Sequence, residues 1–251
     1  MVDDTTVEKP GIVYGVADSQ PLLLDTYRPQ PAQEKGRAVI LIHGGMWTGA
    51  RGEWFHRIRH RRPPSRWRGW PEPLAGPLDD AQEAVRWSRV HAPEYDIDPN
   101  RVAAFGWSAG GQLAALLGTC ETRQDYGSVS ILSRVNLAVV LAADIDLAAC
   151  TQPPARDEVI ALFGGTPDEV PEQYFDASPL SWIDRGTVPI LIIHGLQDDV
   201  VPIDQSCRFA AALRAAGVPT RHIELPDIGH HDLTWERVGP DVIGFLTQVI
   251  P

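Results

Sequence analysis

The sequence predicts an α/β fold in which a mostly parallel central sheet carries helices on both faces. Largely apolar runs of strand length recur along the chain, at 38–42, 102–105, 135–142 and 188–193. Such runs are expected of strands that are covered on both faces. Segments with helical spacing of apolar residues separate several of these runs. Strands that alternate with helices form an open, mainly parallel sheet.

Length, composition and charge narrow the class of protein. The 251 residues fit one large domain, and an apolar content of 43% is enough for a sizeable core. The net charge of −11 disfavours general binding to nucleic acid or to an anionic membrane surface. We therefore expect a single domain over residues 1–251, with no nucleic acid and no membrane as partner. The oligomeric state stays open.

The cysteines and the N-terminus bear on the cellular compartment. Cys120, Cys150 and Cys207 are far apart and lack the spacing of a disulfide framework or a metal site. The first residues are acidic and include no apolar core of a signal peptide. The apolar run 137–143 is too short to span a bilayer. We expect free thiols, no metal site and a cytoplasmic protein.

The first part of the chain is only partly regular. Residues 1–11 have the composition of a loose arm, and a strand is predicted at 22–27. The next strand, at 38–42, stops at a glycine turn. Residues 51–68 then hold seven arginines against one glutamate, and prolines follow. This composition fits an anion-binding loop or an irregular surface segment, and both interpretations remain open.

Regular structure resumes after Pro77. Helices are predicted at 79–91, at 203–216 and from Pro240 onward, because each segment has an apolar stripe at helical spacing. A last strand is predicted at 220–225. Residues 144–186 have little periodicity and many prolines. We expect them to form cap-like loops and short helices over one end of the sheet.

The rest of the chain is organised around the stretch 102–111. An apolar run leads into Gly106-Trp107-Ser108-Ala109-Gly110, and small residues at helical spacing follow. Glycines flank the serine because larger side chains would collide where a strand and a helix approach closely. The pattern predicts a tight turn that exposes the Ser108 hydroxyl, with a helix N-terminus behind it that favours negative charge.

Two later stretches supply the groups that a nucleophilic serine needs. A serine hydroxyl requires an adjacent base, and the base requires an orienting carboxylate. Residues 194–202 read His-Gly-Leu-Gln-Asp-Asp-Val-Val-Pro, and residues 229–231 read Gly-His-His. These stretches resemble the acid and base loops of the α/β-hydrolase superfamily, in which the chain order is Ser, Asp, His. The resemblance covers residues 12–50 and 77–250.

The resemblance implies a role for each residue. Ser108 would be the nucleophile, Asp198 the acid and His230 the general base. Asp199 is an alternative to Asp198, although the spacing from the preceding histidine favours Asp198. His231 is an alternative to His230, although the position directly after a glycine favours His230. His194 is expected to brace the end of its strand.

The turn His43-Gly44-Gly45-Met46-Trp47 suggests an oxyanion hole. It resembles the His-Gly-Gly-Gly loop of hormone-sensitive-lipase-like esterases, and more closely the His-Gly-Gly-x-Trp loop of kynurenine formamidases and related small esterases. Backbone N–H groups of Gly44, Gly45, Met46 and Ala109 would then hold the developing charge. A glycine turn that only ends a strand is the alternative. Trp47 and Trp107 are candidate substrate-binding residues, with core packing as the alternative for either ring.

One interval departs from the superfamily. Its members place a helix and an apolar strand before an Asn/Asp-Tyr-Arg signature, and residues 57–76 contain neither the strand nor the signature. We therefore expect a strand to be altered or missing there, through a family variation or through a local disruption such as a reading-frame slip. Sequencing the coding DNA separates the two hypotheses.

The resemblance implies a serine hydrolase that cleaves carboxylic esters of small to medium size through an acyl-enzyme, without a cofactor. Its partner would be a small-molecule ester or amide. An arylformamidase or a small amidase is the first alternative. A prolyl-oligopeptidase-like peptidase is disfavoured because no propeller accompanies the domain. A non-catalytic binding protein on the same fold is the alternative from another class.

Overall fold

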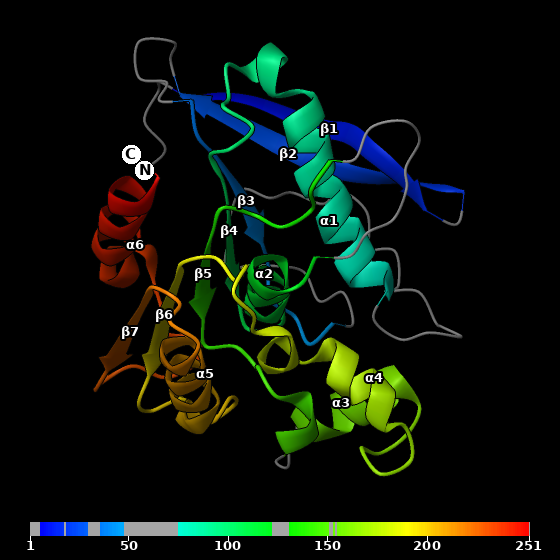
Figure 1. The fold of residues 1–251 in the computed structure, drawn as a ribbon, viewed down its shortest axis with the longest axis vertical. Coiled ribbons are helices and arrows are strands. Elements are labelled where there is room, and N and C mark those ends of the chain that lie inside the picture. The colour runs from blue at the N-terminus through cyan, green and yellow to red at the C-terminus, as the bar shows by residue number, and fades with distance from the viewer. Residues whose placement is uncertain are drawn as a thin grey trace.

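The structure, a computed structural model, describes residues 6–17, 19–29, 36–47, 75–121, 131–150, 153 and 155–250 (Figure 1). Within these ranges an antiparallel strand pair accompanies a five-stranded sheet. The strands are β1 (Thr6–Ala17), β2 (Gln20–Pro29), β3 (Ala38–Ile42), β4 (Val102–Trp107), β5 (Leu137–Leu141), β6 (Ile190–Gly195) and β7 (Thr220–Leu225).

Helices connect the strands of the larger sheet. They are α1 (Ala75–Val90), α2 (Ala109–Thr119), α3 (Ala155–Phe163), α4 (Pro171–Ala177), α5 (Ile203–Ala215) and α6 (Trp235–Val249). Short 3-10 turns cover Ala92–Tyr95, Leu147–Ala149 and Pro179–Trp182. Among the described residues, no helix combines the length and the apolarity needed to cross a bilayer.

The five-stranded sheet has the order β3-β4-β5-β6-β7, and every neighbouring pair is parallel. This confirms the predicted parallel sheet. All residues of β4, β5 and β6 are buried, which explains why these strands have no polar alternation in the sequence. Since the strands are parallel, their carboxyl ends lie at one edge of the sheet, where β4 delivers Ser108.

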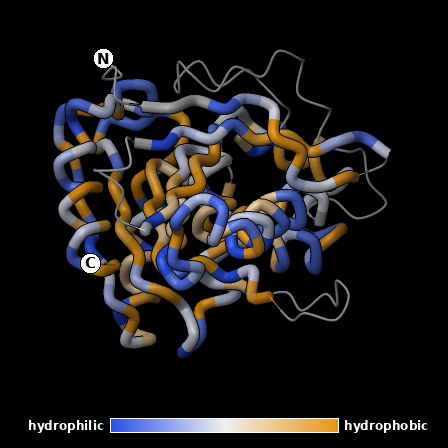
Figure 2. Tube along the Cα trace, turned by 90° about the horizontal axis from the view of Figure 1, so that it is seen from above, coloured by the Kyte–Doolittle hydropathy of each residue, from blue (hydrophilic) through white to orange (hydrophobic). Residues whose placement is uncertain are grey.

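Helices cover both faces of the sheet, as predicted (Figure 1). On one face α6 packs Val242 and Phe245 against Phe105, Val139 and Ile193. On the other face α1 and α2 cover β3 and β4, and α5 covers β5 and β6. Figure 2 shows apolar residues concentrated along these inner strands. The site at the strand ends therefore rests on a core that is packed from two sides.

Two sequence predictions were wrong in detail. Residues 6–11 are part of β1, which pairs with β2, instead of forming a loose arm. A hairpin is held by backbone hydrogen bonds, which require no apolar pattern. The last helix begins at Trp235, upstream of Pro240, because Val238 extends the buried stripe of α6 by one turn.

The interval 57–76 lies outside the described residues, except for Ala75 and Gly76, which begin α1. Within the described part, β3 is an edge strand of the larger sheet, and Val39 and Leu41 on it are exposed. The two hypotheses about an altered strand in this interval stay predictions.

Candidate functional site

Ser108 is held in a strained turn between β4 and α2. Its backbone has φ 56° and ψ −127°, a region that residues with a side chain rarely adopt. A Cβ atom on Gly106 would lie 2.0 Å from the carbonyl oxygen of Gly110, and one on Gly110 would lie 2.2 Å from that of Ile42. Only glycine permits such contacts, so the two glycines allow the strand, the turn and the helix to close around Ser108.

Three side chains from distant loops meet in a hydrogen-bonded series. Nε2 of His230 lies 3.1 Å from Oγ of Ser108, and Nδ1 of His230 lies 2.7 Å from Oδ2 of Asp198. A carboxylate only accepts hydrogen bonds, so Nδ1 carries the proton and Nε2 is left to accept from the serine hydroxyl. Ser108 and His230 are buried. The arrangement can move a proton from the hydroxyl to the imidazole.

Asp198 is fixed at both carboxylate oxygens. Its Oδ1 accepts the backbone N–H groups of Val200 at 2.9 Å and Val201 at 2.7 Å. Burial by itself would raise the pKa of Asp198. Hydrogen bonds from His194, His230 and Val201, together with attraction to the imidazolium when His230 is protonated, outweigh burial and hold this pKa well below its usual range. The neighbouring Asp199 is exposed, and Asp198 is the carboxylate that faces the imidazole.

His194 is a further member of this network that the sequence did not identify as such. The side chain is fully buried, and its Nε2 lies 3.1 Å from Oδ2 of Asp198 and 3.0 Å from the carbonyl oxygen of Val201. Both partners are acceptors, so Nε2 carries the proton. Nδ1 then accepts from the hydroxyl of Ser206 at 2.6 Å. The signal in the sequence was the four-residue spacing from His194 to Asp198, which lets the turn fold back onto the histidine.

Trp107 supports the loop that carries His230. Its indole N–H donates to the carbonyl oxygen of His230 at 3.2 Å, and the two rings lie 5.0 Å apart. The ring of His231, which is exposed, lies 5.7 Å from the same indole. A Cβ atom on Gly44 would lie 2.7 Å from this indole. The indole of Trp107 therefore contacts both the glycine turn after β3 and the loop that carries His230.

The turn after β3 has an unusual backbone. Gly45, Met46 and Trp47 have φ angles of 128°, 54° and 57°. The turn starts against the first residues of α2, since the Cβ position of Gly110 is 2.4 Å from the carbonyl oxygen of His43. Ala109 is the first residue of α2, and the first N–H groups of a helix have no acceptor within the helix. The turn thus brings backbone N–H groups to the same end of the sheet as Ser108.

Trp47 lies in the packed interior. It is only 1% exposed and packs with Ala109 and with residues of α3 and α4. Its indole N–H donates to Oε1 of Gln112 at 3.1 Å, and Nε2 of Gln112 donates to the carbonyl oxygen of Ala177 at 2.7 Å. Trp47 therefore ties the glycine turn to α2 and, through Gln112, to the end of α4.

A second buried carboxyl group, Asp144, lies beyond the end of β5. It is 2% exposed and accepts a hydrogen bond from Sγ of Cys150 at 3.1 Å. Burial raises the pKa of Asp144, and the hydrogen bond from Cys150 and the charge of His230 oppose this rise less strongly. The sequence did not single out Asp144 as part of the site.

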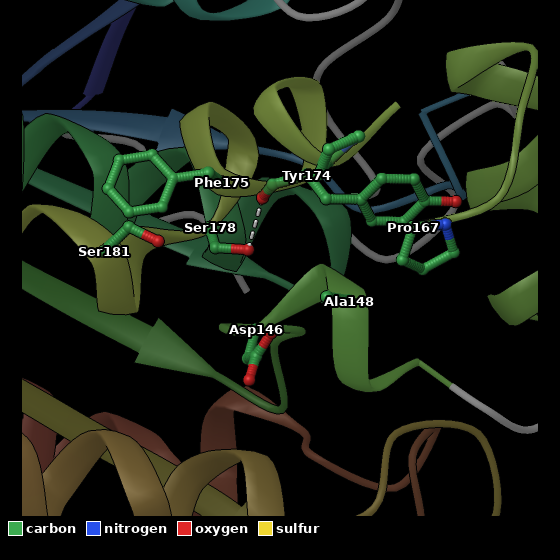
Figure 3. A pocket seen from close by; sticks show the side chains of 8 residues that line it. Asp146, Ala148, Pro167, Tyr174, Phe175, Ser178 and Ser181 are labelled. Carbon is green, nitrogen blue, oxygen red and sulfur yellow. Dashed lines mark hydrogen bonds between the residues drawn. The ribbon is translucent and has the colours of Figure 1, made fainter. Parts of the chain in front are cut away.

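A separate pocket of about 250 Å³ lies between the Asp146 loop and α4 (Figure 3). Phe175 and Ser181 line one side of it, and Pro167 and Tyr174 line the other. Ser178 in this pocket donates to the carbonyl oxygen of Tyr174 at 2.7 Å. None of the three residues in the Ser108 series lines it.

Comparisons with known proteins identify a family and several similar esterases. The family model named BD-FAE matches residues 70–213, a span that includes Ser108 and Asp198. Esterase LipC of Mycobacterium tuberculosis is 28% identical over 97% of this chain and 66% of its own length. The probable carboxylic ester hydrolase LipM of the same organism is 29% identical over 82% of this chain and 52% of its own. The chain therefore spans about half to two thirds of these curated relatives.

Among solved structures, a truncated carbohydrate esterase from gut microbiota superimposes with a TM-score of 0.75. It is 25% identical to this chain, and the alignment covers 98% of both chains. The two proteins therefore share the arrangement of the strands and helices described above.

Proposed function

The chain belongs to the BD-FAE family and has the α/β-hydrolase fold, and from this premise we propose that it is a serine hydrolase of carboxylic esters. The observation that carries the proposal is the hydrogen-bonded series from Ser108 through His230 to Asp198. The esterase names of LipC and LipM support the choice of esters.

In the proposed reaction Oγ of Ser108 attacks the acyl carbon of the ester. Nε2 of His230 takes the hydroxyl proton, and Asp198 stabilises the resulting imidazolium. When the tetrahedral intermediate collapses, His230 returns the proton to the leaving alcohol and an acyl-enzyme remains. A water molecule then attacks the acyl carbon and gives a proton to His230. The bond from the acyl carbon to Oγ of Ser108 breaks, the carboxylic acid leaves, and His230 returns the proton to Oγ. No cofactor takes part.

The oxyanion of the intermediate is proposed to bind backbone N–H groups. Ala109 supplies one at the start of α2, and Gly45 or Met46 supplies another from the turn after β3. The positive φ angles of that turn support this assignment. Gly44 contributes through its close contact with Trp107, which lets the turn approach the site.

The two tryptophans are proposed to act mainly by positioning the site. Trp47 anchors the oxyanion turn, and Trp107 holds the His230 loop. Direct contact of either indole with substrate remains part of the proposal. Residues 144–186 are proposed to form a cap within a single domain of residues 1–251, since α3 and α4 pack around Trp47 and Ala109. A cytoplasmic location stays a prediction.

The substrate class is proposed to be short acyl esters, including those of carbohydrates. The similarity to a carbohydrate esterase over 98% of both chains supports the carbohydrate member of this class. The formamide alternative rests on the His-Gly-Gly-x-Trp turn.

A substrate panel with a matched pair of variants tests the proposal. Rates are measured on p-nitrophenyl acetate and butyrate, an acetylated xyloside and an N-formyl arylamine, with wild type, Ser108→Ala and Ser88→Ala. We expect ester hydrolysis to fall at least about 10⁴-fold in Ser108→Ala. Ser88→Ala, which removes a helix-surface hydroxyl, should match wild type. Equal rates in Ser108→Ala and wild type would reject a serine hydrolase, and a preference for the formamide would favour the amidase alternative.

A further inference from the structure

Three side chains with metal-binding donors cluster on the outer part of the sheet, away from the Ser108 series. Cys207 comes from α5, and His222 and Glu224 come from β7, with donor atoms that all lie within 4.8 Å of one another. Residues two apart on a strand share a face, and α5 packs on β7. Oε1 of Glu224 lies 3.9 Å from Sγ of Cys207 and 3.8 Å from Nδ1 of His222.

His222 lacks the hydrogen bonds that a buried imidazole normally has. Its side chain is 6% exposed, and within the described part of the chain its Nε2 atom has no hydrogen-bond partner. The 3.8 Å separation from Glu224 is too long for a hydrogen bond by Nδ1. Nδ1 is the nitrogen that faces Glu224, so an ion or a water molecule on that side would give the ring the partner that it lacks there.

We propose that Cys207, His222 and Glu224 bind a Zn²⁺ ion. Thiolate, imidazole and carboxylate are the three ligand types that Zn²⁺ takes in proteins, and a water molecule completes the tetrahedron. Zinc–ligand bonds of about 2.0–2.3 Å place tetrahedral ligands roughly 3.3–3.5 Å apart. The two separations that involve Glu224, 3.9 and 3.8 Å, exceed this spacing by a few tenths of an ångström. The donor atoms of Cys207 and His222 lie within 4.8 Å of each other, so these two side chains must approach by up to about 1.3 Å. On binding, the Cys207 thiol loses its proton to solvent and a sulfur–zinc bond forms, without a change in oxidation state.

The charges around the cluster favour a cation overall. The carboxylates of Asp204 and Glu224 face Cys207. The positive charge of Arg214 acts on His222 in the opposite sense and disfavours a cation there. A divalent ion bound by one thiolate and one carboxylate leaves no net charge at the site.

The position of the ion gives it a mechanical consequence. It would join α5 to β7. Helix α5 follows the turn that carries Asp198, and strand β7 precedes the loop that carries His230. Cys207 also follows Ser206, whose hydroxyl contacts His194. Zn²⁺ should therefore raise the unfolding temperature of the protein.

Titration of the metal-free full chain with ZnCl₂, followed by calorimetry, tests the site. We expect one ion per chain and a loss of affinity of at least about tenfold in each of Cys207→Ser, His222→Gln and Glu224→Gln. The matched controls Cys150→Ser and His91→Gln remove a thiol and an imidazole elsewhere and should bind as wild type does. CoCl₂ should give a thiolate-to-cobalt charge-transfer band that is absent in Cys207→Ser.

Two further measurements do not depend on catalysis. Zn²⁺ should slow the alkylation of Cys207 by iodoacetamide in wild type but not in His222→Gln, and it should raise the unfolding temperature only where all three ligands are present. The proposal is overturned if wild type binds no Zn²⁺ or if the three variants bind it as tightly as wild type. Failure of either kind leaves the ester-hydrolase proposal untouched, because neither readout measures activity.

Discussion

The candidate site has two halves: Ser108 with its glycine-flanked turn is the first, and Asp198 with His230 is the second. The two halves hold their side chains by different means. The main chain fixes Ser108, through a positive φ of 56° and two glycines that touch carbonyl oxygens. Side-chain hydrogen bonds fix Asp198 and His230, which lie in loops after β6 and β7. Backbone contacts form as the fold forms, whereas these hydrogen bonds orient groups in a fold that already exists. Substitutions of the glycines around Ser108 should therefore act mainly on folding, and substitutions of the side chains that orient His230 should act mainly on activity.

The substitution expected to destabilise the first half most strongly is Gly110→Ala. The new methyl group would lie 2.2 Å from the carbonyl oxygen of Ile42, so strand and helix must separate. We expect a loss of more than about 3 kcal/mol in the free energy of unfolding, measured by urea denaturation. Gly244→Ala in α6 is the control, because its Cβ position has no atom within 4 Å. It should be neutral or stabilising by up to about 1 kcal/mol. Equal stability of the two variants would contradict the role of the close contact.

In the second half, Asp198→Asn should remove most of the activity without unfolding the protein. The amide can no longer stabilise an imidazolium or fix the tautomer of His230, so we expect kcat on p-nitrophenyl acetate to fall about 10⁴-fold with an unchanged circular dichroism spectrum. Asp199→Asn is the control on the same turn and should retain wild-type kcat. A large loss in Asp199→Asn, with activity kept in Asp198→Asn, would assign the acid to the other residue.

The contrast between the halves also explains what the sequence could predict. The strands β4, β5 and β6 were predictable because burial on both faces leaves an apolar run. Ser108 was predictable because steric contacts between backbones demand glycine, and glycine is visible in a sequence. The positions of Asp198 and His230 followed from a resemblance in spacing, and the structure brings both to Ser108.

What the sequence could not predict depends on side-chain direction. The contact of His194 with Asp198 arises only when the turn folds back. Asp144 interrupts an apolar run, and no local pattern shows that it points inward. Cys207 approaches His222 because α5 packs on β7, and residues so far apart in the chain have no recognisable spacing. β1 was missed for a related reason, since its pairing with β2 is a backbone interaction.

A smaller effect within the second half is expected from His194→Asn. The shorter side chain loses the hydrogen bond to Oδ2 of Asp198, and hydrogen bonds to charged groups are worth about 1.5–3 kcal/mol. We expect kcat to fall roughly 10- to 100-fold with KM unchanged, the signature of an effect on the transition state alone. Ser206→Ala should reproduce the same kcat effect more weakly, because it acts on Asp198 through His194. His91→Gln should leave kcat and KM as in wild type. A rise in KM at constant kcat would show that His194 serves substrate binding instead.

The smallest effect concerns the dependence of stability on pH. Because the pKa of Asp198 is lowered in the folded state, its ionised form contributes stability above the ordinary carboxyl pKa of about 3.9. That contribution is lost as pH falls from there toward the lowered value. In urea unfolding between about pH 6 and pH 3, the difference in free energy between wild type and Asp198→Asn should stay constant above about pH 5 and narrow below about pH 4. Asp199→Asn should follow wild type throughout. A difference that stays constant down to about pH 3 would mean that the hydrogen bonds to Asp198 do not favour its ionised form. The orientation of His230 would then not depend on a charged carboxylate.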